Sequence, residues 1–123
     1  MITEFFKSLI DQDTAEVVIC STAHTIVYMN PAACRHYARF GGEALVGKNL
    51  LCCHNERSQA MILQVLDWFG KSVSHNRVHT FYSEKENKDV YMVALRNASG
   101  ELIGYYEKHE VRARDMTPLY QMD

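Results

Sequence analysis

The stretch that decides the fold is Ile26-Val27-Tyr28-Met29-Asn30-Pro31-Ala32-Ala33. Its first half is β-branched, aromatic and apolar, which is typical of a short strand. Asn30 followed by Pro31 indicates the start of a helix, because the asparagine side chain can accept a hydrogen bond from an unpaired backbone N–H and proline has no N–H to lose. The chain is therefore predicted to pass directly from a strand into a helix.

The residues before this stretch predict a second strand and an amphipathic helix. Segment 15–21 is β-branched and apolar, and residues 22–24 form the turn between the two strands. At the N-terminus the apolar residues that recur at helical spacing are Ile2, Phe5, Phe6, Leu9 and Ile10. The apolar face of this helix is expected to cover either the domain's own sheet or a partner helix.

The residues after the deciding stretch predict helices and then a meander of strands. A helix over 32–40 should end at Gly41-Gly42, segment 43–55 should form short turns, and a long helix should follow over 56–70. Strands are predicted over 77–82, 90–95 and 102–111, and their short links make neighbours antiparallel. The middle strand is apolar on both faces, so we expect the central helices to cover one face of the sheet and the N-terminal helix, from this chain or a partner, the other.

The order of elements and three motifs resemble the PAS fold. The motifs are the deciding stretch itself, Glu43-Ala44-Leu45-Val46-Gly47-Lys48-Asn49-Leu50, and Asn97-Ala98-Ser99-Gly100-Glu101-Leu102-Ile103-Gly104. The resemblance implies an α+β domain with a five-stranded antiparallel sheet in the order 2-1-5-4-3 and helices over one face. It also implies a space between them that holds a small molecule, haem, a flavin or nothing, and dimerisation through the N-terminal helix and the outer face of the sheet. The chain departs from the family pattern at Arg39-Phe40-Gly41-Gly42, which replaces the commoner transition after the first helix.

Length and composition are those of one globular domain. The 123 residues divide into an N-terminal helix over 1–13, a PAS core over 14–116 and a C-terminal tail over 117–123. A net charge of −2 without a cluster of Lys and Arg argues against binding to nucleic acid. No segment is long and apolar enough for a signal peptide or a membrane span, so we expect a cytoplasmic protein whose four cysteines are reduced.

Alternation along the predicted strands and the helical period select the residues that line the internal space. They are Ile26 and Tyr28 on the second strand, Met61 and Val65 on the long helix, and Val90, Met92 and Ala94 on the fourth strand. A register slip of one residue would exchange the last three for Tyr91, Val93 and Leu95. These residues are candidates for contact with a ligand.

Cys53 and His54, in the run Cys52-Cys53-His54, are possible metal ligands at the expected mouth of this space. Thiolate and imidazole both ligate haem iron, so haem stays open as a cofactor, with a buried cysteine and a loop histidine as the alternative. No motif of the flavin photoreceptors is present, which disfavours flavin. His75 and His79 would lie about 13 Å apart on a strand, which disfavours a zinc site.

The sequence therefore predicts a sensory or signalling module rather than an enzyme. It would bind a small ligand or a signalling partner and pass the change on through its N-terminal helix or last strand, as a homodimer. Two alternatives remain: a dimerisation module whose interior is filled by side chains, and a cone-shaped α+β enzyme similar to ketosteroid isomerase. The second would need a buried carboxylate as base, for which Glu107 is the one candidate.

Overall fold

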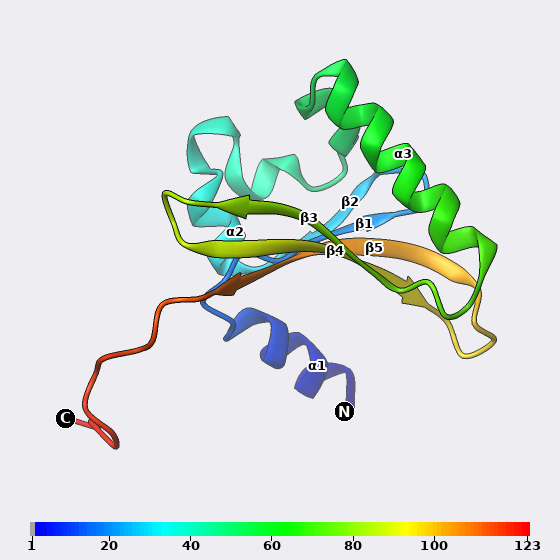
Figure 1. The fold of residues 1–123 in the computed structure, drawn as a ribbon. Helices are drawn as coiled ribbons and strands as arrows, with labels where there is room; N and C mark the ends of the chain where they lie inside the picture. Colours follow the sequence, from blue (N-terminus) through cyan, green and yellow to red (C-terminus); the bar gives the residue numbers. More distant parts are fainter. Residues whose placement is uncertain (1) are drawn as a thin grey trace.

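A five-stranded antiparallel sheet in the order β2-β1-β5-β4-β3 forms the centre of the computed structural model, which describes residues 2–123. The order is the one that the resemblance to the PAS fold implies. The elements along the chain are α1 (Ile2–Asp11), β1 (Val18–Ser21), β2 (Ile26–Met29), α2 (Pro31–His36), η1 (Ala38–Phe40), η2 (Gly42–Leu45), η3 (Leu50–Cys53), α3 (Glu56–Lys71), β3 (Arg77–Ser83), β4 (Lys88–Arg96) and β5 (Leu102–Val111). Figure 1 shows α2, the short helices and α3 on one face of the sheet and α1 on the other.

Asn30 makes the strand-to-helix junction that the sequence predicts. Its side-chain oxygen accepts from the backbone N–H of Ala33 at 2.9 Å, which caps α2, and from the N–H of Val17 at 2.9 Å. Its amide nitrogen donates to the carbonyl oxygens of Ile10 and Ala15, both at 3.0 Å. One fully buried side chain thus joins the end of α1, the approach to β1 and the start of α2.

The predicted helix over 32–40 is wrong in its second half. α2 ends at His36, and a 3-10 turn covers Ala38–Phe40. The backbone leaves the helical region at Tyr37, and Gly41 and Gly42 then adopt positive φ angles of 124° and 54°. The glycines permit a sharper turn than a helix would, because a side chain is disfavoured at such angles.

A β-bulge interrupts the alternation of inward and outward side chains along β2. Cys20 pairs with Ile26 but Ile19 pairs with Tyr28, so Val27 is the extra residue on β2. Ile26 and Met29 are buried on the inner face as a result, while Tyr28 is only partly buried. The bulge therefore decides which residues of this strand face the helices.

β5 lies at the centre of the sheet, between β1 and β4. At Gly104 it passes so close to the Cys20 carbonyl oxygen that a Cβ atom would overlap it, which explains why glycine is required there. In residues 2–123 we find no helix of the length and apolar character needed to cross a membrane.

Candidate functional site: an apolar cavity with one acidic end

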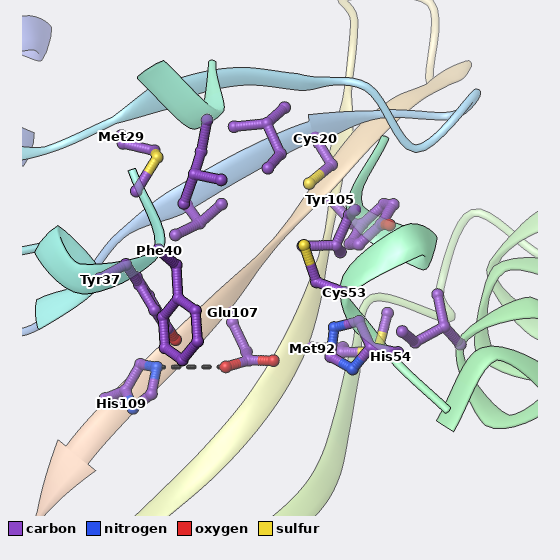
Figure 2. A pocket seen from close by; sticks show the side chains of 15 residues that line it. Cys20, Met29, Tyr37, Phe40, Cys53, His54, Met92, Tyr105, Glu107 and His109 are labelled. Atoms are coloured by element: carbon purple, nitrogen blue, oxygen red, sulfur yellow. Dashed lines mark ion pairs between the residues drawn. The ribbon is translucent and has the colours of Figure 1, made fainter. Parts of the chain in front are cut away.

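A cavity of about 440 Å³ lies between the inner face of the sheet and the helices (Figure 2). Pockets of this size accommodate drug-sized ligands and cofactors. Most of its wall is apolar, and the polar side chains are few. The lining residues are Val18, Cys20, Ile26, Met29, Tyr37, Phe40, Leu45, Leu50, Cys53, His54, Ile62, Met92, Tyr105, Glu107 and His109.

Four of the residues that the sequence selects line this cavity: Ile26, Met92, Cys53 and His54. Three others are near it but do not form its wall. Val65 and Val90 are buried, and Ala94 is half-buried against the core cluster. Val90, Met92 and Ala94 therefore lie on the inner face of β4, as predicted, and the alternative register does not occur.

Two of the selected residues do not reach the cavity. Tyr28 lies past the bulge in β2, and its hydroxyl donates to the Asp11 carboxylate at the end of α1. Met61 is 53% exposed, because the buried stripe of α3 is centred on Ile62 and Val65 and is narrower than the apolar stripe in the sequence. We expected both to line the cavity, and neither of them does.

Sequence reasoning did not select several wall residues. Phe40, Leu45 and Leu50 come from the short helices, and Tyr37 lies between α2 and η1, where no period indicates which side chains point inward. The alternation of β5 does give a signal. Tyr105 is buried, and the positions two and four residues later, 107 and 109, share its face.

One polar group of the wall is already paired. The Tyr105 hydroxyl lies 2.8 Å from Nδ1 of His24 in the turn between β1 and β2. Burial lowers the pKa of His24, which keeps its imidazole neutral at pH 7. Burial also raises the pKa of the Cys20 thiol to about 11 and raises the pKa of Tyr105. This part of the wall is therefore uncharged.

Three other polar groups of the wall form an acidic end. Figure 2 shows Tyr37, Glu107 and His109 together there, and His109 Nε2 lies 3.3 Å from Glu107 Oε1. Behind them, Lys88 Nζ lies 2.7 Å from a Glu86 oxygen and 3.6 Å from a Glu16 oxygen. The pKa of Tyr37 is raised to about 12, first by burial and then by the carboxylates of Glu107, Glu16 and Glu86.

Cys53 and His54 lie at the end of η3, beside the start of α3. The Gln59 side chain on α3 donates to the carbonyl oxygens of Leu51 at 2.9 Å and His54 at 2.8 Å, which fixes this corner. Within residues 2–123 the His54 imidazole takes part in none of the hydrogen bonds or ion pairs found, so its nitrogens are available to a ligand.

A haem group fits this wall poorly, even though His54 offers an axial donor. The two propionates of haem are anionic, and no Lys or Arg of the described chain lines the cavity. The polar end carries the Glu107 carboxylate instead. Buried anions need a cation or hydrogen-bond donors as partners, and this end offers mainly a like charge.

The side chains considered for zinc are separate. His75 lies outside β3, stacks on Trp68 with ring centroids 3.9 Å apart, and its Nδ1 lies 2.7 Å from the Trp68 carbonyl oxygen. His79 Nε2 pairs with Asp89 at 2.7 Å. Residues 2–123 hold no group of three or more His, Cys, Asp or Glu side chains placed to bind a metal ion.

Comparisons with known proteins identify the fold. No family model and no curated protein sequence matches the chain. Among solved structures, a C-terminal domain from Streptococcus mutans is 18% identical with a TM-score of 0.68, covering 89% of this chain and 84% of that one. The PAS domain of a Colwellia psychrerythraea protein is 10% identical with a TM-score of 0.64, covering 90% and 97%.

The Aer2 receptor from Vibrio cholerae, a dual PAS-heme oxygen sensor, is 18% identical with a TM-score of 0.57, covering 76% of this chain and 90% of that one. Together with the sheet order, these similarities make the chain a PAS-fold domain. The cone-shaped enzyme fold considered from the sequence is thereby wrong. Glu107, its one candidate base, lines the cavity of a different fold.

Proposed function

We propose that this domain is a sensory module that binds a small molecule in the cavity between the sheet and the helices. The observation that carries the proposal is a cavity of about 440 Å³ with an apolar wall and a few convergent polar groups. An interior filled by side chains, as in a pure dimerisation module, would have no such space. Ligand pockets have this composition because apolar contacts supply affinity and a few polar groups fix orientation.

β5 offers a route from the cavity to the N-terminal helix. Tyr105 and Glu107 line the cavity, whereas Tyr106 between them points to the opposite face. There Tyr106 lines a shallow depression together with Ile19 of β1 and with Leu9 and Ile10 of α1. A ligand that shifts β5 therefore also shifts the face of the sheet on which α1 lies. We propose that the resulting change in the position of α1 is the signal.

A second copy of the chain is the proposed partner of α1. None of its residues is buried, and Ile2, Phe5, Phe6 and Leu9 are 56–74% exposed. Two identical apolar stripes are self-complementary around a two-fold axis. The PAS family resemblance also implies a dimer through this helix and the outer face of the sheet.

Two substitutions on neighbouring residues of α3 test ligand binding. Ile62 lines the cavity and is buried, whereas Met61 is exposed, so Ile62→Phe fills the cavity and Met61→Phe is its control. The protein is purified from cells, examined by native mass spectrometry for a retained small molecule, and screened against a metabolite library by thermal unfolding. A ligand at about 100 times its Kd stabilises the folded state by about 2.7 kcal/mol.

We expect wild type and Met61→Phe to retain or respond to the same compound, and Ile62→Phe to lose it. Compounds that stabilise Ile62→Phe as much as wild type would place their binding outside the cavity. A folded protein that retains nothing and responds to no compound would exclude the proposed function.

A further inference from the structure

Three polar groups of the cavity wall, Tyr37, Glu107 and His109, lie together at one end, and that end has an excess of negative charge. Three carboxylates, those of Glu16, Glu86 and Glu107, lie around it with Lys88 as the one full cation among them. Two of these carboxylates, those of Glu16 and Glu86, have basic side chains beside them. Lys88 approaches both Glu86 and Glu16, and His36 Nδ1 lies 3.1 Å from Glu16.

Glu107 is the carboxylate with the least compensation, and it is the one that lines the cavity. Its ion-pair partner in the described chain is His109, at 3.3 Å. The Glu107 side chain is 43% exposed, so an oxygen remains accessible to a molecule in the cavity. A carboxylate in an apolar wall favours a ligand that brings a positive charge or hydrogen-bond donors.

The imidazole of His109 gives an independent indication. Its side chain is only 8% exposed and lines the cavity, yet Nδ1 has no hydrogen-bond partner within residues 2–123. Nδ1 faces Glu16 at 3.7 Å, beyond hydrogen-bond distance. With the proton on Nε2, the nitrogen nearer Glu107, Nδ1 is an acceptor without a partner. Acceptors then outnumber donors at this end, and buried acceptors are normally paired.

The electrostatic potential at Tyr37 agrees with this imbalance. Burial and, after it, the same carboxylates raise the pKa of the Tyr37 hydroxyl to about 12, because the carboxylates oppose a further negative charge beside them. An anionic ligand group would meet the same opposition, whereas a cationic group would relieve it.

We infer that the ligand of this cavity is a small molecule with an apolar body and a protonated amine at one end, and that the ammonium group binds Glu107 beside His109. The inference rests on the proposed function, since it names the class of ligand for the same cavity. The apolar body contacts Ile26, Met29 and Met92. A carboxylic acid of the same shape is rejected, because its charge would face Glu107 without a cation to pair with it.

Three probes with one apolar body test the inference: phenylbutylamine, phenylbutanol and phenylbutyrate. Their dissociation constants are measured by calorimetry at neutral pH for wild type, Glu107→Gln and Glu110→Gln. Glu110 is the matched control, because it lies on β5 but does not line the cavity and pairs with Arg77 and Arg112. We expect wild type and Glu110→Gln to bind the amine about tenfold or more tightly than the other probes.

In Glu107→Gln the amine should lose about tenfold or more in affinity, while the affinity for the alcohol changes little. Phenylbutyrate binding as tightly as the amine, or an amine preference that survives in Glu107→Gln, overturns the inference. If the alcohol binds and Ile62→Phe abolishes its binding, but the amine is no tighter, the inference fails and the proposed function stands. If no probe binds, the inference fails, and the library screen with Ile62→Phe then decides the proposed function.

Discussion

Asn30 links three elements through one buried amide, so its removal should cost more than the loss of a helix cap. Asn30→Ala removes the cap on Ala33 and leaves the N–H of Val17 and the carbonyl oxygens of Ile10 and Ala15 without their partner. A cap is worth about 1 kcal/mol, and each buried polar group left unpaired adds about 1–3 kcal/mol. We expect Asn30→Ala to lower the free energy of unfolding by about 4 kcal/mol or more in urea titrations.

Asn55→Ala is the control for this prediction. Asn55 caps α3 through the N–H of Ser58 at 2.9 Å, the same geometry as at Asn30, but it is exposed and makes no other side-chain bond among those found. Its loss should cost about 1 kcal/mol. Equal losses in the two variants would show that Asn30 acts only as a cap.

Residue positions in the cavity could be predicted where a regular period holds. Alternation on β4 correctly placed Met92 at the wall, and Ile26 follows from the strand that precedes Asn30. Tyr28 could not be placed, because the bulge at Val27 depends on pairing with β1 and leaves no mark in the sequence of β2 alone. The alternation of β5 gives the face on which Glu107 lies, but that this face borders a cavity depends on helices that come from distant segments.

At the scale of elements, α1 is an α-helix none of whose residues is buried. Side-chain hydrogen bonds hold its C-terminal end, from Tyr28 to Asp11 and from Asn30 to the Ile10 carbonyl oxygen. If its exposed apolar face forms the dimer, Phe5→Glu should raise the dimer dissociation constant about thirtyfold or more, since large aromatic side chains dominate interface energies. Analytical ultracentrifugation over a concentration series measures this constant.

Ser8→Glu adds the same charge to the polar side of α1 and should leave the dimer unchanged. A protein that is monomeric as wild type, or a Phe5→Glu variant that dimerises as well as wild type, contradicts the proposed interface. Circular dichroism of each variant checks that the fold is retained.

Elements with a cap or a clear period were predictable, and the irregular ones were not. α3 is capped by Asn55 and carries an apolar stripe, and its observed end at Lys71 differs from the predicted end by one residue. The connection from Tyr37 to Cys53 consists of three short 3-10 helices set by glycines and by packing on the sheet. These helices supply much of the cavity wall, so the wall was predicted less well than the sheet.

At the scale of the whole molecule, stability is expected to depend on pH through three weak acids that line one cavity, Cys20, Tyr37 and Tyr105. Burial raises the pKa of Cys20 from 9.0 to about 11, that of Tyr37 from 10.0 to about 12, and that of Tyr105 further. Above about pH 9 the unfolded chain loses protons that the folded chain keeps. Because the folded state then binds more protons, its stability is fully present below about pH 9 and falls as the pH rises toward 11.

Urea unfolding followed by circular dichroism across this pH range measures how far the free energy of unfolding falls. Two tyrosine variants then show which part of the fall comes from Tyr37. Tyr37→Phe removes one of the three acids, so its stability should fall less steeply above about pH 10, where the unfolded tyrosine ionises. Tyr120→Phe changes a side chain that is 90% exposed and should follow wild type. A stability that stays constant up to pH 11, or identical slopes in the two variants, would mean that the cavity does not keep these groups protonated. The expected pattern would instead show that folding removes the side chains of Cys20, Tyr37 and Tyr105 from water, because burial is the largest cause of their raised pKa values.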